Sequence, residues 1–401
     1  MPDRASGAGD AWPADPSSAG TGLPLEGVRV LDLSKILAGP LCVLVAADLG
    51  ADVIKVEAPG IGDKVRLLAP PWFGDDATYY LSVNRNRRSV AVDLAAPEGI
   101  ELVATLARHA DAVVENFLPH QLAELGLAEL RDELADVVWV SVRGAASSGP
   151  LSDAPSFDLL AQARSGLMSV TGSDEGPPMK VGAPLADVVT GLYAAAALLA
   201  GLYAKRATGR PAHRFEVPLL EATVTALVNQ AQGYLATGED PGRLGNDHPS
   251  IAPYGPVATA EGDLFVAVIS KGQFQALCDV LGEPSLSADE RFATNADRVA
   301  NRDELDVALT TLFARRDATA WAEALVAAGV PCGPVHTVAG ALEDPQIREG
   351  GLLAEAETAA GRFRMLRSPI RVDGEWLPVR RSPPALDQDG DAIRASVRES
   401  T

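Results

Sequence analysis

Asp187 is a lone carboxylate at the start of a long apolar segment, GAPLADVVTGLYAAAALLAGLYAKR, residues 182–206. Aspartate is a favoured N-cap and good helix formers follow it, so the side chain could serve to cap a helix. A carboxylate at a helix N-terminus is also kept ionised by the helix dipole, and an ionised aspartate in an apolar setting is a candidate nucleophile toward an activated carbonyl. The local sequence leaves both roles open.

Three arginines, Arg85, Arg87 and Arg88, lie close together just before a predicted strand. The formal net charge of the chain is −20, so this cluster stands out as a phosphate-binding site. The alternative is a solvated turn with surface ion pairs. Arg66 and Arg143 follow other predicted strands and are further candidates for binding an anion.

Several other kinds of chemistry have no motif in the chain. The first predicted strand is followed by neither a Walker A sequence nor a GxGxxG sequence, and no GxSxG segment is present. The five histidines lack metal-ligand spacing, so we predict no metal site. Cys42, Cys278 and Cys332 form no CxxC pair, and we expect small buried apolar residues in a protein of the reducing cytoplasm.

The elements that must position these residues follow an alternating pattern. Short apolar strands alternate with amphipathic helices, which predicts a parallel sheet covered on both faces. The predicted strands are 28–33, 52–57, 89–94, 112–116 and 137–142, and the predicted helices include 39–50, 97–110, 127–135 and 221–236. Ligands of such sheets bind beyond the carboxyl ends of the strands, so we expect the site in the turns SKILAGP, EAPGIGD, ENFLP and RGAASSGP.

The chain of 401 residues predicts two domains. We expect a disordered tail (1–23), a large domain (24–205), a linker (206–236), a small domain (237–330) and a return linker with the C-terminal part of the large domain (331–401). Apolar residues 188–204 are fewer than the roughly 20 needed to cross a bilayer, which favours a buried core helix. The acidic composition argues against nucleic acid or a membrane surface as partner.

Eight segments, in order, resemble the class III CoA transferases, the formyl-CoA and carnitine CoA-transferase type also called CaiB/BaiF. The resemblance runs from about Leu25 to the end of the chain. The segments are LEGVRVLDLSKILAGPLC, ADLGADVIKVEAPGIGD, NRNRRSVAVDL, DAVVENF, FDLLAQARSGLMSVTG, PLADVVTGLYAAAALLAGL, GNDHPSIAPYGPVATAEGDLFVAV and GVPCGPVHTVAGALEDPQI.

This resemblance implies a fold and an activity. The fold is an α/β Rossmann-like parallel-sheet domain with a smaller α+β domain, in a ring-shaped monomer interlocked with its twin as a homodimer. The activity is acyl-CoA:carboxylate CoA transfer, in which Asp187 matches the catalytic aspartate and forms aspartyl anhydride and aspartyl-CoA thioester intermediates. The partners are an acyl-CoA donor and a carboxylic acid acceptor. Coenzyme A enters as a thioester substrate, and no tightly bound cofactor is implied.

The resemblance also implies contacts to CoA. The residues that match the lining of the family's CoA site are Leu37, Ala38, Val92, Asn116 and Phe117, and Arg143 falls where some members carry a lysine. Ala58, Ala95 and Glu124 stand where the formyl-CoA enzyme has basic CoA contacts. We therefore expect Arg66 and the 85–88 cluster, including Arg88, to bind the nucleotide end instead.

Two alternatives to CoA transfer remain. The family's α-methylacyl-CoA racemases use a His–Asp pair, but their histidine falls at Phe157, and phenylalanine cannot transfer a proton. The other alternative is a catalytically silent CoA-binding paralogue in which Asp187 only caps its helix. Among the transferases, the segment GNDHPSIAPYG resembles members that act on succinyl-CoA and other dicarboxylic acids.

Overall fold

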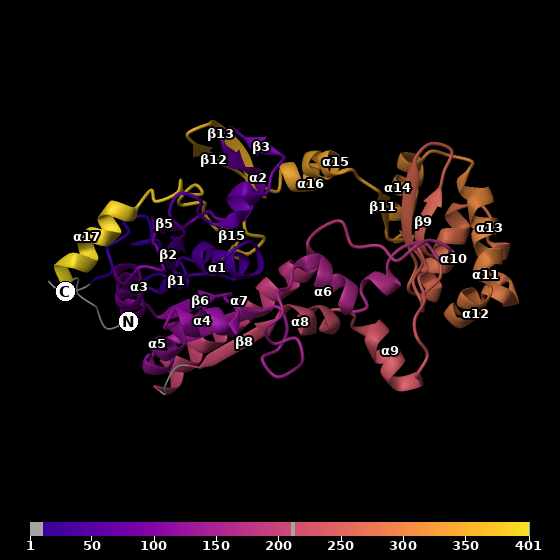
Figure 1. Ribbon diagram of the computed structural model, residues 1–401. Helices are drawn as coiled ribbons and strands as arrows, with labels where there is room; N and C mark the ends of the chain where they lie inside the picture. The colour runs from indigo at the N-terminus through magenta and orange to yellow at the C-terminus, as the bar shows by residue number, and fades with distance from the viewer. Residues whose placement is uncertain (1–10, 210–212, 401) are drawn as a thin grey trace. The chain divides into compact units, whose positions relative to one another are not determined.

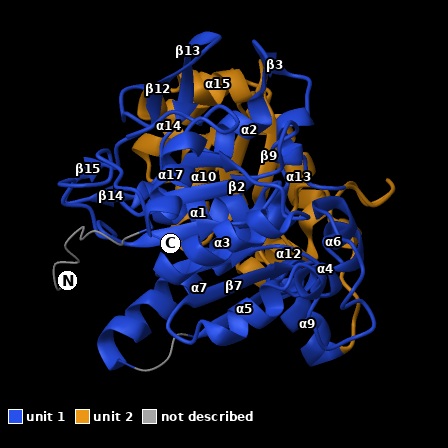
Figure 2. Cartoon of the chain, turned by 60° about the vertical axis from the view of Figure 1, so that its left-hand side comes forward, with its two compact units in different colours: residues 1–167, 180–237, 348–401 blue, residues 168–179, 238–347 orange. Residues whose placement is uncertain are grey.

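The computed structural model describes residues 11–209 and 213–400. These form two compact units (Figure 2). Unit 1 contains residues up to 167, 180–237 and those from 348 onward, and unit 2 contains 168–179 and 238–347. The main segment of unit 2, 238–347, starts one residue after the predicted start of the small domain and extends past its predicted end at 330. Unit 2 also includes the separate segment 168–179, which was predicted to belong to the large domain.

Unit 1 is built on a six-stranded sheet in which every neighbouring pair is parallel (Figure 1). Its strands are β1 (Arg29–Asp32), β2 (Asp52–Glu57), β5 (Arg88–Ala91), β6 (Ala112–Glu115), β7 (Val138–Arg143) and β8 (Arg214–Pro218). They lie in the order β5-β2-β1-β6-β7-β8, so the third strand in the chain lies at one edge and the sixth at the other. This is the doubly wound order of Rossmann folds, and its topological switch point lies between β1 and β6. The predicted fold class is confirmed.

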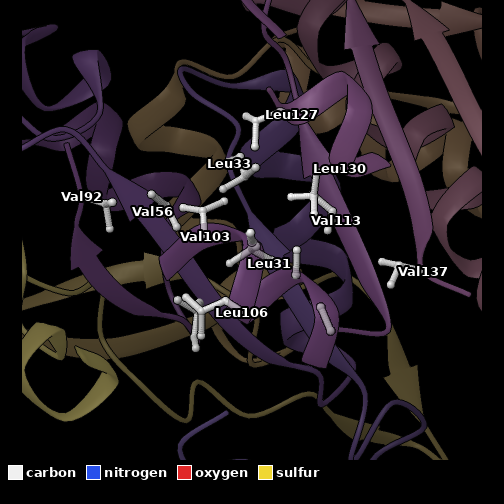
Figure 3. Close-up of a cluster of buried hydrophobic side chains, with 14 of the residues drawn as sticks. Leu31, Leu33, Val56, Val92, Val103, Leu106, Val113, Leu127, Leu130 and Val137 are labelled. Atoms are coloured by element: carbon white, nitrogen blue, oxygen red, sulfur yellow. The ribbon is translucent and has the colours of Figure 1, made fainter. Parts of the chain in front are cut away.

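Both faces of the sheet are covered by helices because successive side chains of each strand point to opposite faces. On one face Val30, Val114 and Val140 pack against α1 (Ala38–Asp48) and α7 (Leu185–Thr208). On the other face a second core includes Leu31 and Val113 with residues of α3 (Pro97–His109), α5 (Leu127–Glu133) and α17 (Gly390–Ser400) (Figure 3).

The remaining elements of unit 1 are short. They are η1 (Lys64–Leu67), β3 (Trp72–Phe73), β4 (Asp76–Ala77), α2 (Thr78–Val83), α4 (Pro119–Glu124), α6 (Asp158–Arg164), α8 (Leu219–Thr225), α9 (Asn229–Thr237), β12 (Leu353–Thr358), β13 (Gly361–Leu366), β14 (Arg371–Val372) and β15 (Glu375–Trp376). The helix predicted over 221–236 is interrupted, because Val228 adopts a φ of 46° between α8 and α9.

The predicted disordered tail differs from the structure over its described part, while residues 1–10 lie outside the described residues. Ala11 and Trp12 are buried in a core of unit 1. The Trp12 Nε1–H donates a hydrogen bond of 2.9 Å to Asp52, and the Asp15 carboxylate lies 3.0 Å from Arg381. The prediction of a disordered tail was wrong for this segment, because Trp12 and Asp15 attach it to the rest of unit 1, and composition does not reveal such contacts.

Helix α7, which carries Asp187, has 24 residues and is longer than predicted, so its length and hydropathy would suit a membrane span. One face nevertheless packs on α1, β7 and β8. Gly191 lies on that face, where an added Cβ would come within 2.8 Å of the Ala38 carbonyl oxygen. Glycine at this position therefore permits the close approach of α7 to α1.

Unit 2 has its own core around a three-stranded antiparallel sheet in the order β11-β10-β9. Its elements are η2 (Met168–Val170), β9 (Tyr254–Ala258), β10 (Asp263–Ala267), α10 (Lys271–Val280), α11 (Ser285–Ala288), η3 (Glu290–Phe292), α12 (Asn295–Ala300), α13 (Arg302–Phe313), α14 (Ala318–Ala327), β11 (Cys332–Pro334) and α15 (Val338–Glu343). Helix α16 (Pro345–Arg348) spans a junction with unit 1. Cys42 and Cys278 are buried in the two units, as expected, and Cys332 is half-buried.

Candidate active site

A cavity of about 310 Å³ lies at the carboxyl ends of the strands of unit 1. Three of the four predicted turns contribute to it, namely residues 35–38 after β1, residues 116–118 after β6, and Arg143 with Gly144 at the end of β7. The turn after β2 does not line the cavity itself, but Lys64, the residue that follows it, does. Gln121, Val142, Leu219, Pro155, Ser156, Phe157 and Asp187 complete its lining. The cavity therefore includes the crevice at the switch point between β1 and β6, where ligands of doubly wound sheets bind.

The turn after β1 is held in place by side chains from other loops. The Asn116 amide accepts the Lys35 N–H at 2.9 Å and donates to the Lys35 carbonyl at 2.8 Å. Ile36, whose φ of 70° is unusual for a β-branched residue, donates its N–H to the Asp63 carboxylate at 3.0 Å. Such strained backbone persists only where its surroundings fix it, so this turn presents a defined surface to the cavity.

Buried charges beneath the cavity connect the turns after β1 and β2. Lys55 is fully buried, and its Nζ lies 3.0 Å from an Asp63 oxygen and 3.6 Å from an Asp32 oxygen. Lys55 also donates to the Ser34 carbonyl at 2.9 Å. Burial by itself lowers the pKa of Lys55, but Asp32 and Asp63 raise it above its ordinary value. The ammonium therefore stays charged and links both turns.

Asp187 is the third residue of α7, so the expected capping role is wrong. Pro184 occupies the N-cap position, and Asp187 lies within the first turn of the helix. The carboxylate that binds the helix end is Asp158, which accepts the Ala186 N–H at 2.9 Å and the Gln162 amide at 2.8 Å. The Asp187 side chain forms no hydrogen bond or ion pair with the part of the chain that is described, and it faces the cavity.

The expectation that the helix end holds Asp187 ionised is corrected as well. Burial first, and the negative charge of Asp158 second, raise the pKa of Asp187 to about 7. These effects outweigh the helix dipole, which favours the charged form by less than about 1 kcal/mol at most sites. The surroundings of the carboxylate thus stabilise its charge little.

Tyr79, on α2, is a neighbour of Asp187 that the sequence analysis missed. Burial raises the pKa of Tyr79 to about 12, with further contributions from Asp187 and Asp158. The phenol therefore remains protonated at neutral pH and is a hydrogen-bond donor. A tyrosine in the segment TYYLSV carries no local signal that distinguishes it from a core residue.

The arginines predicted to bind an anion are instead bound to buried carboxylates, which corrects that prediction. Arg66 contacts both oxygens of Glu57, at 2.7 and 2.8 Å, and stacks on Tyr80. In the 85–88 cluster, each arginine pairs with an aspartate: Arg85 with Asp48, Arg87 with Asp32 and Arg88 with Asp52. Arg66 and Arg88 do not line the cavity.

The other residues predicted to contact CoA line the cavity, with the exception of Val92. Leu37, Ala38, Asn116 and Phe117 line the cavity together with Asp187. Arg143 also lines it, but its guanidinium lies 2.9 and 3.0 Å from the two oxygens of Glu115. Val92 belongs to the apolar core beside α3, which Figure 3 shows, and not to the cavity.

A doubly wound sheet with a carboxylate of raised pKa in its switch-point cavity is typical of an α/β protein of the ligand-binding Rossmann type. The chain belongs to CoA-transferase family III, which it matches over residues 25–390. It is therefore a CoA transferase, and the resemblance seen in the sequence is confirmed.

Similar proteins include the succinyl-CoA:glutarate CoA-transferase of Homo sapiens, 37% identical over 96% of this chain and 89% of that protein. The succinate–glutarate CoA-transferase of Agrobacterium fabrum is 39% identical over 93% of this chain and 96% of that protein. Among solved structures, a CaiB/BaiF family protein from Brucella suis has a TM-score of 0.82 and is 37% identical, and the match covers 94% of this chain and 99% of that one.

Proposed function

We propose that this CoA transferase uses Asp187 as the nucleophile that moves CoA between carboxylic acids. The observation that carries the proposal is the unpaired Asp187 carboxylate in the cavity of unit 1. A carboxylate without hydrogen-bond donors retains its lone pairs for attack on an acyl carbonyl.

The reaction proceeds through four balanced steps. Asp187 attacks the acyl-CoA carbonyl, which forms a mixed anhydride and releases the CoA thiolate. The thiolate attacks the aspartyl carbonyl, so an aspartyl-CoA thioester forms and the first acid leaves. The incoming carboxylate then displaces the thiolate and forms a second anhydride. Finally the thiolate attacks the acyl carbonyl of that anhydride, which gives the new acyl-CoA and restores the Asp187 carboxylate.

Each step passes through an oxyanion that needs hydrogen-bond donors. The first backbone N–H groups of α1 have no partner within their helix, and Leu37 and Ala38 line the cavity there. The protonated Tyr79 phenol, close to Asp187, is a further donor. We propose that these groups stabilise the negative charge that develops on the attacked carbonyl.

The proposed acids are short dicarboxylates, with succinyl-CoA as donor and a dicarboxylate such as glutarate as acceptor. The support is the GNDHPSIAPYG segment together with the names of the two similar enzymes. We also propose, from the family resemblance, a cytoplasmic homodimer; light scattering of the purified protein tests its mass.

The test of this function is to incubate the enzyme with succinyl-CoA, add hydroxylamine or borohydride and map the modified peptide by mass spectrometry. We expect modification at Asp187. A panel of mono- and dicarboxylates, read by the mass of the new CoA ester, is expected to favour dicarboxylates. Deuterium that enters the α-position of the acyl group from solvent would indicate a racemase, and we expect none.

The raised pKa of Asp187 predicts the pH dependence of transfer. Only the ionised carboxylate is a nucleophile, so kcat/KM is expected to rise about tenfold per pH unit below pH 7 and to level off above it. In Asp158→Asn the negative charge disappears while an oxygen remains to accept the Ala186 N–H, so the rise is expected at lower pH. Exposed Asp132→Asn is the control and is expected to leave the profile unchanged. A flat profile between about pH 5.5 and 8.5 contradicts the proposed nucleophile.

A further inference from the structure

Two cations in the cavity of unit 1 have no part in the proposed mechanism, namely Lys35 and Lys64. Lys35 is half-buried, and its Nζ lies 4.8 Å from the centre of the Phe117 ring. Lys64 is exposed at the start of η1. Neither ammonium has an ion-pair or hydrogen-bond partner among residues 11–209 and 213–400, so both are available to an anion that enters the cavity.

These lysines differ from the arginines at the same edge of the sheet. Arg66 and Arg143 each bind a buried glutamate, and the arginines of the 85–88 cluster each bind an aspartate. Within the described residues that line the cavity, Lys35 and Lys64 are thus the side-chain cations without a carboxylate of their own. In a chain of net charge −20, two such cations at one cavity are a strong indication of an anionic ligand.

The charges of the two lysines influence each other. Burial lowers the pKa of Lys35, Asp63 opposes this, and the charges of Lys64 and Lys55 lower the pKa further. Asp63 itself is paired with Lys55. The cavity therefore holds two ammonium groups as well as the Asp187 carboxylate.

We propose that Lys35 and Lys64 bind the phosphate groups of CoA. This inference rests on the proposed function, because the thioester must lie at Asp187 for its orientation to hold. Of the substrates in the proposed reaction, CoA carries the most negative charge, in its pyrophosphate and 3′-phosphate, and Lys35 and Lys64 are cavity cations without a carboxylate partner among the described residues. A lysine ammonium is a compact point charge that forms charge-assisted hydrogen bonds to phosphate.

Isothermal titration calorimetry with free CoA tests the proposal without any need for transfer activity. Lys35→Met keeps the apolar stem over Phe117, and Lys64→Met changes an exposed side chain. Each is expected to weaken CoA binding about 10-fold or more, because a hydrogen bond to a charged group is lost. Lys35→Arg is expected to restore most of the affinity. Lys205→Met is the control: its side chain lies outside this cavity beside Asp111, and CoA binding is expected to be unchanged.

Two further ligands identify the group that is bound. With 3′-dephospho-CoA, a smaller effect of the variants identifies the 3′-phosphate as the partner, and an equal effect identifies the pyrophosphate. With succinyl-pantetheine, which has no phosphate, the KM is expected to be the same for variants and parent. A matching loss with succinyl-pantetheine would mean that the lysines act on the acyl end and would overturn the proposal, as would unchanged CoA binding.

The proposed function and the proposed phosphate site fail in distinguishable ways. If transfer persists without Asp187 while the lysine variants still lose CoA affinity, the nucleophile is wrong and the phosphate site stands. If Asp187 is modified as expected while the lysine variants bind CoA like the parent, the phosphate site is wrong.

Discussion

Replacing Asp187 with asparagine is expected to lower the rate of CoA transfer by at least about 10⁴-fold, because an amide cannot form the anhydride intermediate. The side chain keeps its size, so its neighbours on α7 and in the cavity are not displaced. The measurement is the formation of glutaryl-CoA from succinyl-CoA and glutarate, followed by mass spectrometry. Transfer that persists within about tenfold of the parent rate would refute the assignment of Asp187 as nucleophile.

The stability of the same variant separates lost chemistry from lost folding. The folded-state pKa of Asp187 is raised to about 7, so this group favours the folded state below its ordinary pKa, and that contribution disappears as the pH rises through 7. At pH 8 the parent therefore has a partly buried charge that Asp187→Asn does not have. The Tm of the variant at pH 8 is expected to equal or exceed that of the parent, and free CoA is expected to bind both.

The second large effect is expected from Lys55→Met, which removes the fully buried cation beneath the cavity. Two aspartates, Asp32 and Asp63, then lose a partner at 3.6 and 3.0 Å, although Arg87 still binds Asp32. Removal of one partner from a buried ion pair costs about 3–5 kcal/mol of unfolding free energy. Urea denaturation followed by circular dichroism measures this loss as a lower midpoint at an unchanged slope.

Lys205→Met is the matched control for this prediction, since it makes the same chemical change in the same unit. Lys205 is partly exposed, and its Nζ lies 3.7 Å from Asp111. Such pairs contribute about 0–1 kcal/mol. Equal losses for Lys55→Met and Lys205→Met would show that burial of the Lys55 network contributes nothing.

Much of the architecture could be predicted from the chain because its signals are local. Short segments rich in valine and other apolar residues indicate buried strands, and β1, β2, β5, β6 and β7 lie within a few residues of their predicted places. The order of strands and helices then predicted the ends of the strands at which the cavity lies, and three of the four predicted turns line it. The aspartate in PLADVVTG was identified by its place among eight family segments, since its local sequence by itself favoured a cap.

The charges could not be assigned from the sequence, because a charged side chain is neutralised by partners that are near in space and distant in the chain. Arg85, Arg87 and Arg88 looked available, yet their aspartates lie 37, 55 and 36 positions earlier. Asp158, which binds the start of α7 and raises the pKa of Asp187, lies 28 residues before Ala186.

The sequence by itself therefore determined the family, the α/β class and the aspartate that we propose as the nucleophile. The tertiary structure decided that Asp158 and not Asp187 binds the helix end, and that Lys35 and Lys64 and not the arginines are free to meet an anion. The physical reason is that buried residues recur at a fixed spacing along each strand and helix, so these elements can be predicted from neighbouring positions in the chain. The ionisation and availability of a side chain depend instead on burial and charges supplied by the whole fold.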